Sequence, residues 1–275
     1  MQYVEARGLQ KACSDRAREG REHTRPTRTW WPRLLAALVL VATMLPASAQ
    51  SIRVVTEDYP PYNFEKNGVV EGVSTAVVRA VLAEAGLDAQ IQLMPWARAY
   101  ELAQHADNVL IYSMARTSAR EDMFKWVGQV APSEWFLYSY RGREVPLKTL
   151  EDAKRYRIAT VYQDVGEQYL LEKGFDRKRN LQSSNRYAHN YEKLKLGRVD
   201  LWIASSVLAD YLAREAGSDP ALQLKAELKL EEIGDNGLYM AFSLGTSDAL
   251  VERCRQAFER LRRAGRLPRA GRGGS

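Results

Sequence analysis

The sequence predicts an α/β fold made of two lobes, each a mixed, mainly parallel sheet flanked by helices. Short apolar runs alternate with amphipathic stretches, which is typical of helices packed on mainly parallel strands. A charged break at residues 141–148 divides this alternation into two series. Two strand-like segments near the C-terminus then return the chain to the first series. The chain is therefore expected to leave one lobe, build a second and come back.

The first 49 residues are excluded from this fold because they have the pattern of a secretion signal. Basic and aromatic residues at 25–33 precede an apolar run at 34–45, which is shorter than the roughly 20 residues that span a bilayer. Ala47 and Ala49 then fit the A-x-A pattern of signal-peptide cleavage. We expect cleavage after Ala49; an uncleaved membrane anchor is the alternative.

The first lobe is expected to open with a strand at 51–56, which runs into a loop from Asp58 to Tyr62. Two prolines in this loop prevent regular structure. Apolar periodicity predicts the remaining elements. They are a helix at 72–85, a strand at 89–94, a short helix opened by Pro95 and ending near Leu102, a strand at 108–113 and an extended, aromatic chain from 123 to 140.

The second lobe repeats a strand–helix pattern. Its expected elements are a helix at 149–155, a strand at 157–162, a helix at 166–173, a strand at 180–183, a helix at 186–196, a strand at 200–204 and a helix at 206–215. Two strands at 224–231 and 238–244 follow, joined by a turn at 234–237. A final helix at 247–261 is capped by Thr246 or Ser247, with Asp248 in its first turn.

The charge distribution gives no evidence for a nucleic acid partner. The whole chain has a net charge of +6, but 32 basic and 30 acidic residues remain once the leader is removed. Six of the remaining arginines lie between 260 and 272, so the high isoelectric point comes from the two ends. We expect residues 265–275 to form a disordered, solvated basic tail.

The cysteine content excludes a disulfide framework. Only Cys254 remains after the leader, so the core alone must stabilise the mature chain. Val251, Ala257 and Phe258 lie at helical spacing around it, which indicates a buried thiol. With one cysteine and no H-x-H or C-x-x-C spacing, we expect no metal ion and no other cofactor.

A set of short motifs occurs in a characteristic order. The motifs are Tyr59-Pro60-Pro61-Tyr62-Asn63-Phe64, Glu71-Gly72, Arg116-Thr117-Ser118-Ala119-Arg120, Phe124-Lys125-Trp126-Val127-Gly128 and Leu196-Gly197-Arg198-Val199-Asp200. Together they resemble the type II periplasmic solute-binding proteins of family 3, the polar amino acid class. Pro95-Trp96-Ala97-Arg98-Ala99-Tyr100 is similar to one subgroup of this family. The resemblance covers nearly all of the chain after the leader, and its specificity lies in the order and spacing of the motifs.

The resemblance implies a type II periplasmic-binding-protein fold, in which two lobes hinged by two strands close on a ligand. The hinges would lie at about 136–141 and 231–239. Lobe 1 would comprise 50–138 and 238–264, and lobe 2 would comprise 139–237. A protein of this kind is a periplasmic monomer that presents a small polar, carboxylate-bearing solute to an ABC-type membrane permease.

The resemblance also assigns the principal ligand-binding candidates. Arg120, three residues after Thr117, matches the arginine that grips the ligand's carboxylate in amino acid binders. A guanidinium suits this role because it can hold both carboxylate oxygens and stays charged; the alternative is a surface ion pair with Glu121 or Asp122. Tyr59 matches an aromatic wall whose ring stacks on the ligand while its hydroxyl stays in water. Its alternative role is packing beside the prolines.

Thr117, in the same motif as Arg120, is a further ligand-binding candidate. Trp96, Arg98 and Arg116 are weaker candidates for the cleft. Arg98 and Arg116 there would favour an anionic ligand. Equally, Trp96 can belong to the core of its lobe, and Arg98 can be a solvated helix residue.

Two residues depart from the family pattern. Ser205 stands where amino acid binders carry the acidic residue that holds the ligand's ammonium group, which argues against an α-amino acid. Ala115 replaces a serine five residues before Arg120, which removes another expected hydrogen bond. Asp164 could serve as the anionic partner instead, or it can be the N-cap of the helix that begins at Gly166.

An enzyme with the same scaffold, such as a cyclohexadienyl dehydratase, is the main alternative function. It would need a titratable group of shifted pKa facing the ligand, and neither His105 nor His189 lies in a catalytic motif. The sequence has no serine-nucleophile elbow and no phosphate-binding glycine loop. A ligand sensor module is a further alternative, although such a domain is normally tethered. We therefore expect a binding protein and not an enzyme.

Overall fold

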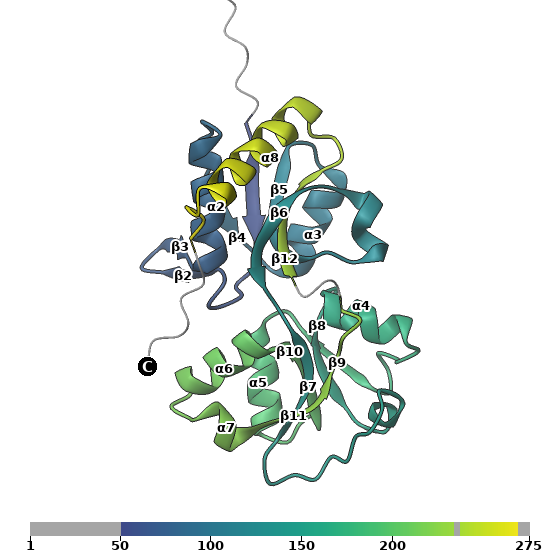
Figure 1. The fold of residues 1–275 in the computed structure, drawn as a ribbon. Helices are drawn as coiled ribbons and strands as arrows, with labels where there is room; N and C mark the ends of the chain where they lie inside the picture. Colours follow the sequence, from purple (N-terminus) through teal and green to yellow (C-terminus); the bar gives the residue numbers. More distant parts are fainter. Residues whose placement is uncertain (1–50, 234–236, 269–275) are drawn as a thin grey trace, which may run out of the picture. The chain divides into compact units, whose positions relative to one another are not determined.

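The computed structural model describes residues 51–233 and 237–268. The expected secretion signal, the centre of the expected turn at 234–237 and most of the expected basic tail lie outside these residues. The described residues form two five-stranded sheets, one two-stranded hairpin and the helices that cover them (Figure 1). The predicted α/β fold with two lobes is confirmed.

The sheet of the first lobe has the strand order β4-β1-β5-β12-β6. Its strands are β1 (Arg53–Thr56), β4 (Ile91–Leu93), β5 (Val109–Ala115), β6 (Phe124–Pro132) and β12 (Gly237–Ser243). Strand β1 is parallel to β4 and β5, whereas β12 lies antiparallel between β5 and β6. Because β12 comes from the end of the chain, this sheet is complete only after the second lobe has been built.

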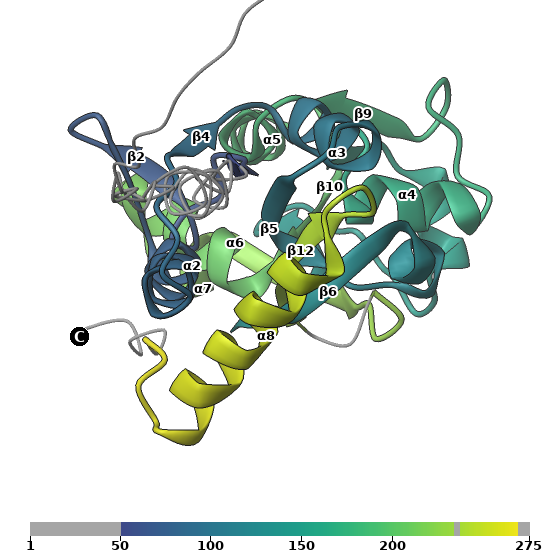
Figure 2. The same ribbon diagram turned by 90° about the horizontal axis from the view of Figure 1, so that it is seen from above.

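Three helices cover the first sheet, namely α2 (Val73–Glu84), α3 (Trp96–His105) and α8 (Asp248–Arg263). Helix α8 packs on α2 and β6, whereas α3 packs on β1, β5 and β12. Figure 2 shows strands of the sheet between α8 and α3. Cys254 is a buried free cysteine of α8, as predicted.

Gly72 precedes α2 in a conformation that requires glycine. Its φ is +117°, and a Cβ atom there would lie 2.3 Å from the carbonyl oxygen of Tyr62. This close approach lets the Tyr62 carbonyl accept a hydrogen bond of 3.0 Å from the backbone of Ser74. The loop after β1 is thereby fixed against the start of α2.

The sheet of the second lobe has the order β11-β7-β10-β8-β9. Its strands are β7 (Trp135–Tyr140), β8 (Ile158–Val161), β9 (Leu181–Ser184), β10 (Leu201–Ser205) and β11 (Leu224–Lys229). Its helices are α4 (Val165–Glu172), α5 (Tyr187–Lys195), α6 (Ser206–Glu215) and α7 (Pro220–Gln223). Strands β8, β9 and β10 are parallel, and β7 is antiparallel to β10 and β11.

Several short elements differ from the sequence prediction. The hairpin β2 (Phe64–Lys66) and β3 (Val69–Glu71), the 3-10 helix η1 (Ser118–Met123) and α7 were not predicted. They are too short and too exposed to show an apolar period. The helix predicted at 149–155 is a 3-10 turn, η2 (Glu151–Arg155), and α3 begins at Trp96 with Pro95 as its N-cap.

The crossing between the sheets lies earlier than the expected hinge. Strand β6 ends in the first sheet at Pro132, and β7 lies wholly in the second sheet from Trp135, where it pairs with β10 and β11. The segment expected as a hinge at 136–141 is therefore mostly a strand of lobe 2. We propose that the lobes divide near Ser133 on the outward path, and between Lys229 and Gly237 on the return.

Candidate functional site

Side chains that follow the parallel strands of both sheets meet at one small cavity. In α/β sheets, ligands bind outside the carboxyl ends of the strands, where loops lead into helices. Glu57 and Tyr59 follow β1, Trp96 follows β4, Arg120 follows β5, Asp164 follows β8 and Tyr187 follows β9. All six side chains line the cavity, and Ser205 at the end of β10 contacts one of them.

Arg120 is the cation of this cavity and is only 1% exposed. Its Nη1 donates to the carbonyl oxygen of Ala115 at 3.1 Å, and its Nε and Nη2 donate to Oε1 of Gln168 at 3.2 and 2.8 Å. Within residues 51–233 and 237–268, Arg120 forms no ion pair; Arg116, not Arg120, pairs with Glu121. The guanidinium therefore has only neutral hydrogen-bond acceptors.

Aromatic rings hold the Arg120 guanidinium in place. Its Cζ lies 5.3 Å from the ring centre of Trp96 and 4.9 Å from that of Tyr100. The Trp96 indole is 3% exposed and donates its Nε1 hydrogen to the carbonyl oxygen of Gln163 in lobe 2 at 2.7 Å. Trp96 is thus both a core residue and a wall of the cavity.

Tyr59 lies in the cavity, but in a different setting from the expected one. Its hydroxyl is buried and donates to Oγ of Ser205 in lobe 2 at 2.8 Å, so the expected contact with water is wrong. Its ring stacks on Tyr187, with ring centres 4.7 Å apart. The loop around Tyr59 is closed by mutual backbone hydrogen bonds with Asn63, which turn the ring inward. Ser205 also caps α6 by accepting from the Leu208 amide.

Two buried carboxyl groups face the same cavity. The Tyr187 hydroxyl lies 3.4 Å from Oε1 of Glu57 and 3.3 Å from Oδ2 of Asp164. Burial, and next the charge of Asp164, raise the pKa of Glu57 well above its usual range. Burial also raises the pKa of Asp164 to about 7, although its hydrogen bond from the Glu167 amide opposes the rise. That hydrogen bond makes Asp164 the N-cap of α4 as well as a cavity residue.

The backbone beside the cavity is unusual at two positions. Ser113 in β5 and Gln163 before α4 have φ values of +59° and +61°, which are uncommon for residues other than glycine. Ser113 lines the cavity, and the Gln163 carbonyl receives the Trp96 hydrogen bond. Such conformations are often found at functional sites.

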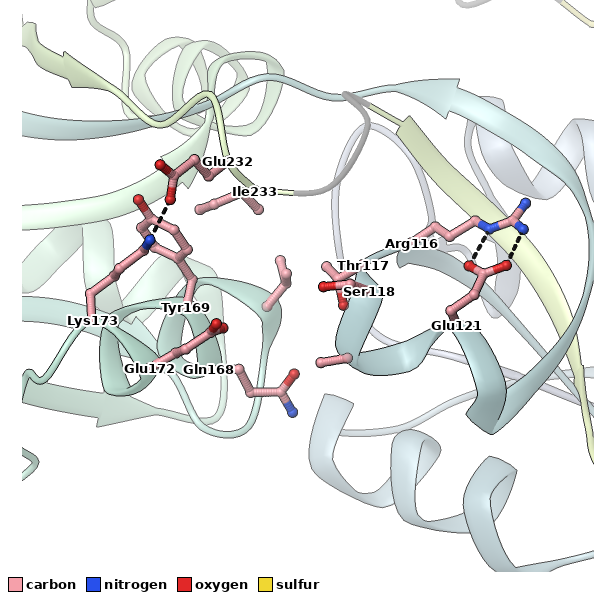
Figure 3. A pocket seen from close by; sticks show the side chains of 12 residues that line it. Arg116, Thr117, Ser118, Glu121, Gln168, Tyr169, Glu172, Lys173, Glu232 and Ile233 are labelled. Atoms are coloured by element: carbon pink, nitrogen blue, oxygen red, sulfur yellow. Dashed lines mark hydrogen bonds and ion pairs between the residues drawn. The ribbon is translucent and has the colours of Figure 1, made fainter.

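The cavity is too small for a solute, but two larger grooves adjoin it. It has a volume of about 10 Å³, about that of one water molecule. A groove of about 570 Å³ shares Val165 with it, and a second of about 420 Å³ shares Glu57. Figure 3 shows the larger groove, with Gln168 and Lys173 on one side and Thr117 and Ser118 on the other. A solute can therefore reach Arg120 only when the lobes separate or side chains move.

Three sequence candidates lie away from the cavity. Arg116 and Thr117 line the larger groove, where Arg116 pairs with Glu121 and lies over the ring of Trp126. Arg98 is exposed on α3, and it is not among the described residues that line the cavity.

Comparison with known families shows to which of them the chain belongs. Residues 52–270 match the model of the bacterial extracellular solute-binding proteins, family 3. The chain belongs to this family. No curated protein sequence matches this solute-binding protein.

Solved structures share the fold of this solute-binding protein. An ancestral arginine-binding protein bound to arginine matches with a TM-score of 0.68 and 19% identity, over 79% of this chain and 94% of the other. A histidine kinase sensor domain with similarity to periplasmic binding proteins matches with a TM-score of 0.68 and 21% identity, over 79% and 92%. An ancestral amino acid-binding protein, a precursor of cyclohexadienyl dehydratase, matches with a TM-score of 0.64 and 18% identity, over 79% and 91%. At these identities the likeness shows the type II binding-protein fold alone.

Glu57, Tyr187 and Gln168 are among the residues of the solute-binding protein's site that sequence reasoning missed. Glu57 lies directly before the predicted loop, Tyr187 begins α5, and Gln168 lies on α4. For Glu57 and Tyr187 a usable signal was present, because both follow the carboxyl end of a predicted parallel strand within a few residues. Gln168 carried no such signal, since its contact with Arg120 depends on how the two lobes meet.

The described part of the chain offers neither a membrane-spanning helix nor a cluster of metal ligands. No helix in residues 51–233 and 237–268 is long and apolar enough to cross a membrane. In the same ranges, no three His, Cys, Asp or Glu side chains are grouped to bind a metal ion.

Proposed function

We propose that this protein is a periplasmic monomer that binds a small polar solute between its lobes and delivers it to an ABC-type permease. The solute bears a carboxylate and a cationic group. The observation that carries the proposal is the buried Arg120, whose described hydrogen-bond acceptors are all neutral. The family supports binding of a solute, and the leader sequence supports secretion.

A carboxylate suits the surroundings of Arg120. A buried charge is costly unless an opposite charge and hydrogen bonds accompany it. The guanidinium has five N–H donors in a planar fork, of which three have acceptors in the described structure. A carboxylate entering this fork would bring a negative charge into direct hydrogen-bond contact with the guanidinium and accept two parallel hydrogen bonds.

A cationic group suits the two carboxyl groups opposite. If Glu57 and Asp164 were both ionised, they would outnumber the single Arg120 in a sealed, low-dielectric space. An ammonium group of the solute near the Tyr187 hydroxyl would compensate the excess charge and favour ionisation of both acids. Glu57 and Asp164 could thus replace the acidic residue absent at Ser205, so the departure there does not exclude a zwitterion.

Isothermal titration calorimetry with a panel of solutes tests this function. The panel contains zwitterionic amino acids, monocarboxylic acids, dicarboxylic acids and primary amines, and native mass spectrometry first identifies any solute that co-purifies. We expect binding of one or more zwitterions, weaker binding of acids or amines alone, and no consumption of the solute. Absence of binding across the zwitterions would contradict the proposal.

A pair of arginine variants tests the assignment of the site. Arg120→Ala should weaken binding at least about 100-fold, because a buried charged pair is lost. Arg98→Ala should bind as the wild type does, because Arg98 is exposed outside the cavity. Equal affinities for the two variants would remove Arg120 from the site.

A lyase acting in the same cleft is a second candidate, and one observation favours it. Burial raises the pKa of Asp164 to about 7, which makes it a candidate general acid near neutral pH, and Glu57, whose pKa burial also raises, lines the same cavity. Incubation of the bound solute with the protein, followed by mass spectrometry, separates the two functions. A dehydrated product that is lost in Glu57→Gln would favour the enzyme.

A further inference from the structure

Gln168 in lobe 2 makes a contact with Arg120 that resembles a bound carboxylate oxygen. Its Oε1 accepts from both Nε and Nη2, which form one edge of the guanidinium. This edge presents two parallel N–H groups, the arrangement that binds both oxygens of a carboxylate. One neutral amide oxygen therefore occupies an edge suited to an anion.

The two lobes contribute differently to the hydrogen bonds of Arg120. The Nη1 group donates to the carbonyl of Ala115, which lies in β5 of the same lobe as Arg120. The Nε–Nη2 edge is held by α4 of the other lobe. If the lobes separate, the Ala115 bond remains and the Gln168 bonds break. Opening therefore frees the Nε–Nη2 edge specifically.

The guanidinium has little freedom to turn to another acceptor. It lies beside the rings of Trp96 and Tyr100, and Arg120 is almost fully buried. Gln168 also lines the groove of about 570 Å³ (Figure 3), and its amide oxygen contacts Arg120, which lines the cavity. A carboxylate approaching from this groove meets Gln168 first.

We propose that Gln168 sets the affinity of the cleft for carboxylates, because its amide oxygen competes with the ligand's carboxylate for the Nε–Nη2 edge of Arg120. This inference rests on the proposed binding of a carboxylate. Displacement of a neutral acceptor by a carboxylate is favourable, because charge-assisted hydrogen bonds are the stronger ones. The Gln168 amide therefore lowers the affinity for every carboxylate ligand. It also joins the two lobes by a hydrogen bond to Arg120 when no ligand is bound.

Two variants of matched size at position 168 test the competition in opposite directions. Gln168→Met keeps the side-chain volume but removes the acceptor, which leaves Arg120 donors unpaired until a ligand arrives. It should bind carboxylate ligands roughly tenfold more tightly. Gln168→Glu supplies a carboxylate of its own and should bind them at least roughly tenfold more weakly. Gln256→Ala, on the exposed face of α8, is the control and should equal the wild type.

Calorimetry of all four proteins at pH 7.5 uses L-arginine, L-glutamine and L-glutamate as probes, and circular dichroism checks the fold. Opposite changes in the two variants support the competition. Weaker binding by both overturns it, because Gln168 then contacts the ligand directly; unchanged binding by both also overturns it.

Small-angle scattering without added solute separates this inference from the proposed function. If the wild type binds none of the three probes, the carboxylate assignment fails for this panel, but the contact between lobes can still be judged. We expect a smaller radius of gyration for Gln168→Glu than for Gln168→Met. Equal radii would show that Gln168 does not hold the lobes together through Arg120.

Discussion

Two buried glutamates of this protein differ in what surrounds them. The Glu167 carboxylate in α4 accepts hydrogen bonds from the Arg177 guanidinium at 2.8 Å, from the backbone N–H of Gln163 at 2.7 Å and from the Ser183 hydroxyl. Burial alone would raise its pKa, but the hydrogen bonds from Arg177 and Ser183 overcome this and lower it. Glu57 is also buried, yet the described structure gives its carboxylate only the Tyr187 hydroxyl, and burial raises its pKa.

This difference separates a structural carboxylate from a candidate binding group. The Glu167 network is complete within the described residues and fixes the Gln163–Asp164 turn that borders the cavity. Among the described residues, no cation lies at hydrogen-bond distance from Glu57 or Asp164, and no anion lies at that distance from Arg120. Burial is common to all of them. What distinguishes the cleft is that its opposite charges act on one another across the cavity without forming an ion pair at hydrogen-bond distance among the described residues.

The largest effect expected from this comparison is on stability. Glu167→Ala should lower the free energy of unfolding by about 3 kcal/mol, because it removes buried acceptors from Arg177, Ser183 and the Gln163 amide. Urea unfolding measures this value. Glu172→Ala, an exposed site on the same helix, should change stability by less than about 0.5 kcal/mol. Similar losses of unfolding free energy in Glu167→Ala and Glu172→Ala would show that the buried Glu167 network does not stabilise the fold.

A smaller effect concerns the pH dependence of stability. The folded state holds the Asp164 proton up to about pH 7, whereas an unfolded Asp releases it near pH 4. Stability therefore falls as pH rises between these values, by about 2 kcal/mol or more. Asp164→Asn keeps the N-cap and should flatten this fall, measured by urea unfolding at pH 5 and pH 8. An unchanged slope would show that Asp164 ionises freely.

The opposite sign is expected for Glu167 at lower pH. Because its folded pKa is lowered, it stabilises the protein above the unfolded pKa of a glutamate and loses this contribution as the solution is acidified. Glu167→Gln should therefore reduce the rise of stability between about pH 3 and pH 5. The same unfolding series, extended to pH 3, measures it.

The smallest effect is expected at the contact between Tyr59 and Ser205. Tyr59→Phe removes one hydrogen bond between the lobes and should cost about 1 kcal/mol. Tyr162→Phe, whose side chain is 45% exposed, is the control and should be close to neutral. A loss of stability in Tyr59→Phe no larger than that in Tyr162→Phe would show that the hydrogen bond to Ser205 does not stabilise the protein.

The sequence predicted the main strands and helices well, because each carries an apolar run or period of sufficient length. It did not predict the β2–β3 hairpin, whose two strands of three residues are largely exposed. The resemblance to the family placed the first hinge at about 136–141, and the sequence alone predicted one extended segment from 123 to 140. Only strand pairing reveals that β7 belongs to the second sheet.

The site was partly accessible from sequence. Arg120, Tyr59 and Ser205 were assigned through their match to family positions, and Asp164 through its place in the loop before the helix predicted at Gly166. Their partners were not accessible, because the Ser205 bond to Tyr59 and the Gln168 bond to Arg120 join segments 146 and 48 residues apart. The way the two lobes pack against each other determines which side chains of one lobe contact the other, and a single sequence does not reveal this packing.

The buried thiol in α8 has a practical consequence for measuring closure. Cys254 is inaccessible, and burial raises the pKa of its thiol to about 11, so the reactive thiolate is scarce at neutral pH. Maleimide dyes would therefore attach selectively to cysteines introduced at exposed positions. Ser118 and Lys173 lie on opposite sides of the larger groove and provide such a pair for single-molecule fluorescence. Cys254 therefore need not be mutated before the opening and closing of the lobes are followed in real time.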